Sequence, residues 1–129
     1  MTKYPNELKY SKEHEWVKET DDVYTIGITD YAAEQLGDIV HLELPQPGDE
    51  FGTGDAFGVV ESVKSVSDAY MPVAGRIAEV NEVVINNPGV VNDDPYAEGW
   101  IIKIAIEDKS EIDNLMTAQA YEAFIAEES

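Results

Sequence analysis

Cysteine is absent from this chain of 129 residues, so disulfides, thiolate chemistry and cysteine-based metal sites are excluded. Long apolar runs are absent as well, and no segment approaches the length needed to span a bilayer. The first residues, MTKYPNELKY, contain no apolar stretch and no arginine, unlike a signal or transit peptide. The sequence therefore predicts a cytoplasmic protein, although a mature organellar protein whose presequence has been removed would look the same.

Basic residues are scarce: 8 lysines and arginines stand against 27 aspartates and glutamates, giving a formal net charge of −19. Such a charge would repel phosphate backbones, which argues against binding to nucleic acid or anionic membranes. The acidity is explained either by solubility or by steering toward basic partners, and composition does not separate the two. The length fits one domain spanning residues 1–129, with a modest core.

Enzyme and metal motifs are incomplete. The stretch HEWVK starts like the zinc motif H-E-x-x-H, but Lys18 occupies the last position, and the only histidines are His14 and His41. The stretch GTGDAFG lacks the glycine spacing of a dinucleotide-binding loop. Ser62 and Lys64 would share a strand face, but nothing nearby indicates the oxyanion hole that a Ser-Lys dyad needs. We expect no catalytic residue and no metal, with a carboxylate-only metal site as the remaining alternative.

Hydrophobic residues mostly alternate with a period of two, which is typical of half-buried strands. In residues 39–44, for example, Val40, Leu42 and Leu44 are expected to share one face. Turn-forming stretches such as PQPGDE, GTGD and NNPG separate the strands. The predicted strands are residues 24–29, 39–44, 56–63, 66–73, 74–81 and 100–106.

Helix is the minor component. Residues 29–37 have Thr29 as N-cap and Gly37 as a stop signal, which predicts a short helix between them. The stretch NPGVVN is expected to form one helical turn, and the tail two short helices over residues 110–116 and 118–126. The chain is therefore predicted to be mainly β, with short helices that include a C-terminal helical segment.

One lysine has an unusual setting. Between Glu19 and Ile102 the only basic residues are Lys64 and Arg76. The stretch VVESVKSVSDAY joins two predicted strands with almost no spare residues, which predicts a tight hairpin with Lys64 at or beside its tip. Valines at 63 and 66 are expected to fix the register of this hairpin, glycines at 48 and 75 bracket it, and carboxylates at 61 and 68 stand on its two arms. These features favour a specific role for the lysine over that of an ordinary solvated charge.

The stretch from about Leu44 to Asn81 resembles a lipoyl/biotinyl carrier domain, with Lys64 where that family attaches its cofactor. Biotin carriers have methionines beside this lysine, whereas Val63 and Ser65 resemble the lipoyl branch. The likeness then extends over nearly the whole chain. LKYSKEHEWVK, YTIGITDYAAEQLGDIVHLELPQPGD, GVVESVKSVSDAYMPVAGRIAEVN and NDDPYAEGWIIKI match, in order, the pattern of the glycine cleavage system H-protein family.

This resemblance implies a lipoyl-type flattened barrel-sandwich hybrid and a carrier rather than an enzyme. Lipoate would be joined to Lys64 by an amide bond. The implied partners are a pyridoxal-phosphate glycine decarboxylase, a tetrahydrofolate-dependent aminomethyltransferase, a flavin dihydrolipoyl dehydrogenase and the lipoylating enzymes. The carrier would take an aminomethyl group from the first partner to the second, and the third would reoxidise the dihydrolipoyl arm.

The resemblance also implies a cleft that shelters the loaded arm. By position, its acids would be Glu15, from the HEW segment, and Asp68, after the lysine, with Glu13 and Gln35 as secondary candidates. Two alternatives are left open by the residues. One is an H-like protein that relays lipoyl groups to other enzymes, and the other is an unmodified acidic interaction module.

Overall fold

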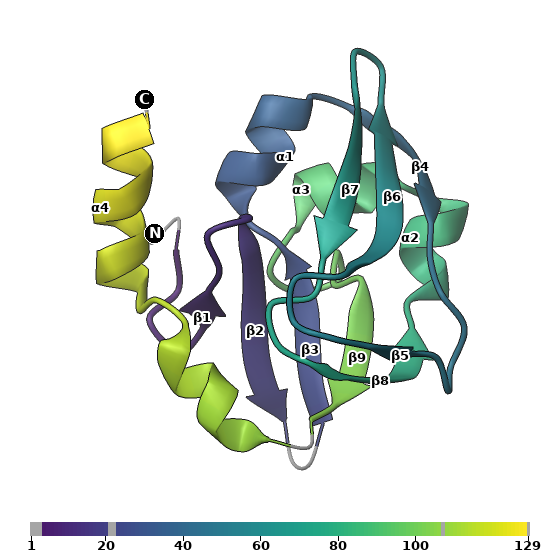
Figure 1. The fold of residues 1–129 in the computed structure, drawn as a ribbon. Helices are drawn as coiled ribbons and strands as arrows, with labels where there is room; N and C mark the ends of the chain where they lie inside the picture. Colours follow the sequence, from purple (N-terminus) through teal and green to yellow (C-terminus); the bar gives the residue numbers. More distant parts are fainter. Residues whose placement is uncertain (1–3, 21–22, 107, 129) are drawn as a thin grey trace.

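The computed structural model describes residues 4–20, 23–106 and 108–128, and their strands form two sheets (Figure 1). The larger sheet has the strand order β1-β2-β3-β9-β8-β5, and the smaller one has the order β4-β6-β7. All neighbouring strands pair antiparallel, and neither sheet closes on itself. The strands are β1 Lys9–Tyr10, β2 Glu15–Thr20, β3 Val23–Ile28, β4 Ile39–Glu43, β5 Glu50–Phe51, β6 Ala56–Ser62, β7 Val66–Tyr70, β8 Gly75–Val80 and β9 Ile102–Ala105.

Every strand predicted from the period of two is present, though several are shorter than expected. The prediction of half-buried strands is too simple for β3, because Thr25 and Gly27 are buried as well as the alternating residues Tyr24, Ile26 and Ile28. Trp16 covers Gly27 so closely that a Cβ at this glycine would lie 2.6 Å from the indole ring. The strand is therefore buried on both of its faces.

Of the three residues predicted to share one face of β4, Leu42 and Leu44 pack against the main core, but the placement of Val40 with them is wrong. Val40 is 53% exposed, whereas Ile39 and Leu42 are both buried. The register against β6 shifts between Ile39 and His41, which is the mark of a β-bulge. One extra residue in a strand reverses the alternation of side chains, so Val40 points to solvent instead of sharing the face of Leu42.

The first helix, α1 (Asp30–Leu36), forms where the sequence predicts it. The hydroxyl oxygen of Thr29 accepts a hydrogen bond from the backbone N–H of Ala32, at 3.2 Å, as an N-cap does. Gly37 ends the helix with φ 85°, in the left-handed region that glycine adopts without strain. This helix lies beside the hairpin of β6 and β7, and the two elements together form the site described below.

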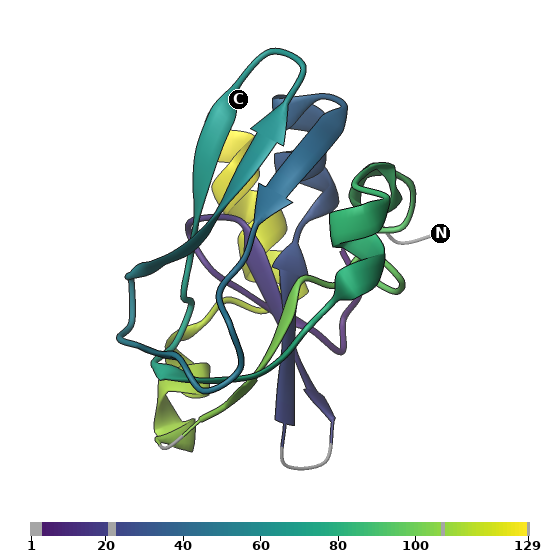
Figure 2. The same cartoon turned by 90° about the vertical axis from the view of Figure 1, so that its right-hand side faces the viewer.

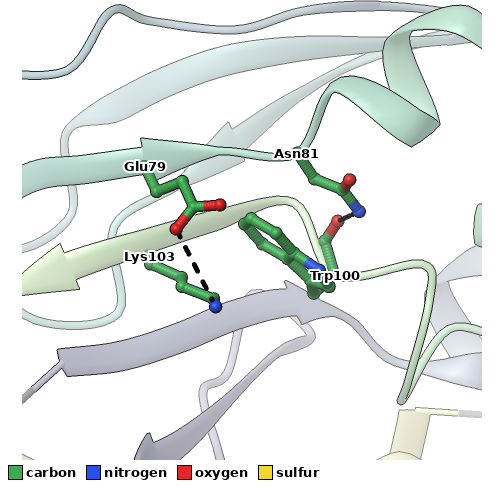
Figure 3. Close-up of polar contacts among 4 residues, drawn as sticks. All are labelled: Glu79, Asn81, Trp100 and Lys103. Carbon is green, nitrogen blue, oxygen red and sulfur yellow. Dashed lines mark hydrogen bonds and ion pairs between the residues drawn. The ribbon is translucent and has the colours of Figure 1, made fainter.

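Two further short helices precede β9. Helix α3 (Gly89–Asp93) corresponds to the turn expected in NPGVVN, whereas α2 (Glu82–Asn86) was not predicted. Asn81 caps α2 and also donates a hydrogen bond to the carbonyl oxygen of Glu98, at 2.9 Å. A second hydrogen bond joins it to the carbonyl oxygen of Trp100, at 2.7 Å (Figure 3). Nζ of Lys103 forms an ion pair with Oε1 of Glu79, at 3.9 Å, and lies 4.8 Å from the ring centroid of Trp100. These contacts hold the start of β9 against β8.

The C-terminal segment forms a 3-10 helix, η1 (Lys109–Asn114), and an α-helix, α4 (Ala118–Glu128), close to the two helices predicted there. Figures 1 and 2 show α4 on the outside of the molecule, on the side of β1. Its buried residues join an aromatic cluster that is separate from the main core between the sheets. This second cluster consists of Tyr4, Leu8, Tyr10, Trp16, Ala118, Tyr121 and Ile125. Among the described residues, no helix is both long and apolar enough to cross a membrane.

Candidate functional site

The hairpin of β6 and β7 projects beyond the rest of the molecule and carries Lys64 at its tip, as predicted (Figure 1). The turn is closed by a hydrogen bond from the N–H of Ser62 to the carbonyl oxygen of Ser65, at 2.8 Å. The hydroxyl oxygen of Ser62 accepts the N–H groups of Lys64 and Ser65, at 3.3 and 3.0 Å. The hydroxyl of Ser62 therefore contacts the backbone of Lys64 and not its side chain, which is exposed to solvent.

The role predicted for the two valines is wrong. Val63 and Val66 are 68% and 67% exposed, so their side chains do not pack in a way that would fix the register. The turn hydrogen bonds of Ser62 do this instead. A further bond, from the N–H of Val63 to the carbonyl oxygen of Asp38 at 3.0 Å, ties the tip to the segment between α1 and β4.

The hydrocarbon stem of Lys64 lies against the end of α1. A Cβ built on Gly37 would be 3.1 Å from Cε of the lysine, and 3.7 and 3.8 Å from Cδ and Cγ. Glycine is favoured at this position by the left-handed backbone, and the lysine stem passes close beside it. The contact places the stem of the lysine beside α1, the helix that borders a hollow together with the hairpin.

That hollow is a cleft of about 310 Å³. It brings together all four acid and amide residues proposed for it, namely Glu13, Glu15, Gln35 and Asp68, from the loop before β2, from the start of β2, from α1 and from β7. Three of them are exposed at its rim, whereas the side chain of Glu15 is buried. The apolar part of the wall consists of Ile28, Ala32, Leu36, Val60 and Ala69.

Glu15 is the most unusual group in the cleft. It is 2% exposed, and its carboxyl group accepts hydrogen bonds from the hydroxyl of Ser11, at 2.6 Å, and from the N–H of Tyr70, at 3.4 Å. Burial raises the pKa of Glu15 to about 8, against the effect of these two hydrogen bonds. The group is therefore mostly protonated at neutral pH, and it would become ionised if a cation entered the cleft.

Sequence reasoning missed the residues that support this acid. Ser11 also accepts the N–H of Glu15, at 3.0 Å, so a single hydroxyl holds both ends of the residue. A serine four residues before a buried glutamate carries no recognisable signal unless the tight loop between them is known. No group of three or more His, Asp or Glu side chains in the described part of the chain is placed to hold a metal ion.

Comparison with known proteins identifies the family of this chain. The sequence model described as Glycine cleavage H-protein matches residues 8–128. The chain belongs to the glycine cleavage H-protein family. A glycine cleavage system H protein from Carboxydothermus hydrogenoformans is 53% identical over 128 residues, covering 99% of this chain and 98% of that protein. One from Staphylococcus epidermidis is 53% identical over 123 residues, covering 95% and 98%.

A solved structure agrees with the sequence comparison. The crystal structure of a glycine cleavage system H protein from Mycobacterium marinum matches this fold with a TM-score of 0.84 at 34% identity, over 95% of this chain and 98% of that one. The predicted fold class, a mainly β lipoyl-type fold with a C-terminal helix, is thereby confirmed. Members of the glycine cleavage H-protein family are lipoate carriers, so this chain is a carrier component of the glycine cleavage system and not a catalyst.

Proposed function

We propose that lipoate is attached to Lys64 by an amide bond and that residues 1–129 act as one carrier domain, with the core motif at about residues 44–81. The observation that carries the proposal is the position of the lysine, at the tip of a projecting hairpin and with its stem against the end of α1, the helix that forms one wall of a cleft containing acids. The chain has no cysteine, so the dithiolane ring would supply redox and nucleophilic chemistry that its own side chains lack.

The residues around Lys64 fit such a group. An aliphatic arm would lie along the apolar wall of the cleft, of which Leu36 and Val60 are parts, while the acids meet its polar end. The lysine stem and the arm form a long tether, and tethering raises the effective concentration of the cofactor at a docked partner. Amide formation also removes the positive charge of the lysine. In this proposal Lys64 therefore serves as an attachment point for the arm and not as a charged group, although bases are scarce around it.

The partners are those of the glycine cleavage system. We infer that the carrier receives an aminomethyl group from a pyridoxal-phosphate glycine decarboxylase and delivers it to a tetrahydrofolate-dependent aminomethyltransferase. A dihydrolipoyl dehydrogenase then restores the disulfide form of the arm, and lipoylating enzymes attach it in the first place. Both relatives described above are bacterial, which supports a cytoplasmic site for this cycle.

The acids of the cleft are proposed to hold the loaded arm. The aminomethyl cargo carries an amine that is protonated at neutral pH, and a carboxylate would give it a charge-assisted hydrogen bond. Glu15 is neutral in the empty cleft because it is buried, but a neighbouring ammonium lowers the pKa of a carboxyl group and favours its ionised form. Asp68 at the rim is already exposed to solvent and meets the same cation at a smaller desolvation cost.

Replacement of the lysine tests the attachment. Lys64→Arg keeps the charge and the exposure of the side chain, so the free energy of unfolding should change by no more than about 0.5 kcal/mol. The intact mass of protein purified from its native cell should show a lipoyl increment for the wild type and for Lys109→Arg, an exposed control, but not for Lys64→Arg. Lys64→Arg, which lacks the lipoyl increment, should also fail to support glycine decarboxylation. An unmodified wild type would favour the acidic interaction module, and lipoylation without activity toward the decarboxylase would favour the lipoyl relay.

Neutral variants test the cleft. In water the loaded arm loses its cargo by hydrolysis, in which the sulfur–carbon and carbon–nitrogen bonds of the aminomethyl group both break, one water supplies the oxygen, and the products are the free thiol, formaldehyde and ammonium. Glu15→Gln and Asp68→Asn should accelerate this release, because a hydrogen bond to a charged group is worth about 1.5–3 kcal/mol, or about 10- to 150-fold in rate. Glu43→Gln, at an exposed position on β4 outside the cleft, is the matched control. Lipoylation of each variant is first confirmed by mass, and release rates equal to the wild type in both would reject the cleft role.

A further inference from the structure

One buried phenol connects the C-terminal helix to two walls of the cleft. The hydroxyl oxygen of Tyr121, on α4, lies 2.8 Å from Nδ1 of His14 and 2.8 Å from Oγ1 of Thr29. Tyr121 and Thr29 are both fully buried, and Tyr121 does not itself line the cleft. Burial also raises the pKa of Tyr121, so its hydroxyl keeps its proton and remains available as a donor.

The two partners of this hydroxyl, His14 and Thr29, stand directly before two elements that form walls of the cleft, namely β2 and α1. His14 stands between Glu13 and Glu15, and it is the one non-glycine residue with positive φ, at 70°, in the described part of the chain. Such a backbone is disfavoured for histidine and persists only where its surroundings hold it. Thr29 is the N-cap of α1, the helix that supplies Tyr31, Ala32, Gln35 and Leu36 to the cleft.

The hydrogen bonds form a consistent chain. Oγ1 of Thr29 accepts the N–H of Ala32 at 3.2 Å, so it can donate its own proton to the phenol oxygen, and the phenol can in turn donate to Nδ1 of His14 when that nitrogen carries no proton. The backbone N–H of Thr29 donates to the carbonyl oxygen of His14, at 3.0 Å, so the two walls are also joined directly. The imidazole ring lies 4.9 Å from the ring of Tyr31 on α1 and 6.0 Å from that of Phe124 on α4.

We propose that Tyr121 is a positioning residue for the arm cleft, through which helix α4 holds the His14 loop and the start of α1 in the arrangement that places Glu15 against the loaded arm. The proposal rests on the function proposed for the cleft. It assigns a task to the C-terminal helix, which contributes no side chain to the cleft itself.

A single oxygen atom separates the test variant from the wild type. Tyr121→Phe removes the hydroxyl and keeps the ring. Tyr10→Phe is the matched control, because the ring of Tyr10 is stacked on that of Tyr121, at 4.9 Å, and its hydroxyl donates to the carbonyl oxygen of Pro5, at 2.7 Å. Both variants therefore lose a hydroxyl hydrogen bond in the same aromatic cluster, but only one loses a contact with the cleft walls.

The first readout is independent of lipoate. The chain has only two histidines, so ¹⁵N NMR of the imidazole rings in the unmodified protein separates His14 from the exposed His41, which serves as an internal reference. Tyr121→Phe should shift the Nδ1 resonance of His14, whereas Tyr10→Phe should leave it unchanged. The second readout is cargo release from the loaded protein, which should be about 3- to 10-fold faster in Tyr121→Phe than in Tyr10→Phe.

The outcomes separate this proposal from the proposed function. Equal release rates in the two tyrosine variants would overturn the positioning role, with or without a shift of the His14 resonance. Faster release in Glu15→Gln, together with equal release in the two tyrosine variants, would support the role of Glu15 and overturn only the positioning role. Faster release in Tyr121→Phe, together with wild-type release in Glu15→Gln, would overturn the role of Glu15 and with it a positioning role that acts through Glu15.

A second pair of variants covers the case in which Tyr121→Phe does not fold. Asparagine tolerates a left-handed backbone and holds a polar atom near the place of Nδ1, so His14→Asn should keep the wild-type release rate. Glycine tolerates the same backbone but has no side chain, so His14→Gly should release the cargo about as fast as expected for Tyr121→Phe. Wild-type rates in both would overturn the proposal.

Discussion

Replacing Glu15 by glutamine should change how the stability of the protein depends on pH. The pKa of this carboxyl group is about 8 in the fold against an ordinary value of 4.5, because the side chain is buried. The folded state thus binds a proton that the unfolded state has already released. The resulting stability is fully present below pH 4.5 and is lost as the pH rises toward 8.

The magnitude follows from the two pKa values. Each pH unit between them costs about 1.4 kcal/mol, so the wild type should lose about 5 kcal/mol of its free energy of unfolding across this window. Glutamine is neutral at every pH, so the variant should not lose this part of its free energy of unfolding. Its amide can still accept the hydroxyl of Ser11 but leaves the N–H of Tyr70 without its acceptor, which costs about 1 kcal/mol at every pH. The variant should be slightly less stable than the wild type at pH 5 and clearly more stable at pH 8.

The assay is chemical denaturation of both proteins at intervals from pH 5 to 9. The informative quantity is the difference between their free energies of unfolding, because the titration of all other groups cancels in it. Glu43→Gln, at an exposed position on β4 outside the cleft, is the control, and its difference from the wild type should lack the slope. Parallel wild-type and Glu15→Gln curves would refute the reasoning, since they would mean that the carboxyl group folds in its ionised form.

Two further outcomes test the packing and the charge. Gly27→Ala should destabilise the fold by about 2–3 kcal/mol, because its Cβ would lie within 2.8 Å of three atoms of the Trp16 indole; Gly89→Ala, whose nearest neighbour is 3.8 Å away, should be neutral or slightly stabilising. Equal unfolding midpoints for the two would contradict the close approach seen at Trp16. The affinity for the decarboxylase should fall as ionic strength rises, because the net charge of −19 steers the carrier toward basic surfaces, and a flat profile in a titration from low to physiological salt would assign the acidity to solubility alone.

Local features of this protein could be predicted from the sequence because short-range rules govern them. The period of two located the strands, Thr29 and Gly37 bounded the first helix, and the short connection between two strands put Lys64 at a hairpin tip. The face of Val40 was predicted wrongly, since a single bulge reverses the alternation and leaves no local mark in the sequence.

The sequence by itself determined a mainly β chain with one exposed lysine at a hairpin tip, a strongly acidic surface and a family pattern along nearly its whole length. Only the tertiary structure decided which residues meet in the cleft. Glu15, Gln35 and Asp68 come from three different elements, and long-range packing brings them to one hollow. The pKa of Glu15 depends on the water excluded around it, and the contact of Tyr121 with His14 spans 107 residues. Solvent exclusion and such distant contacts are properties of the assembled core, which no local residue pattern specifies.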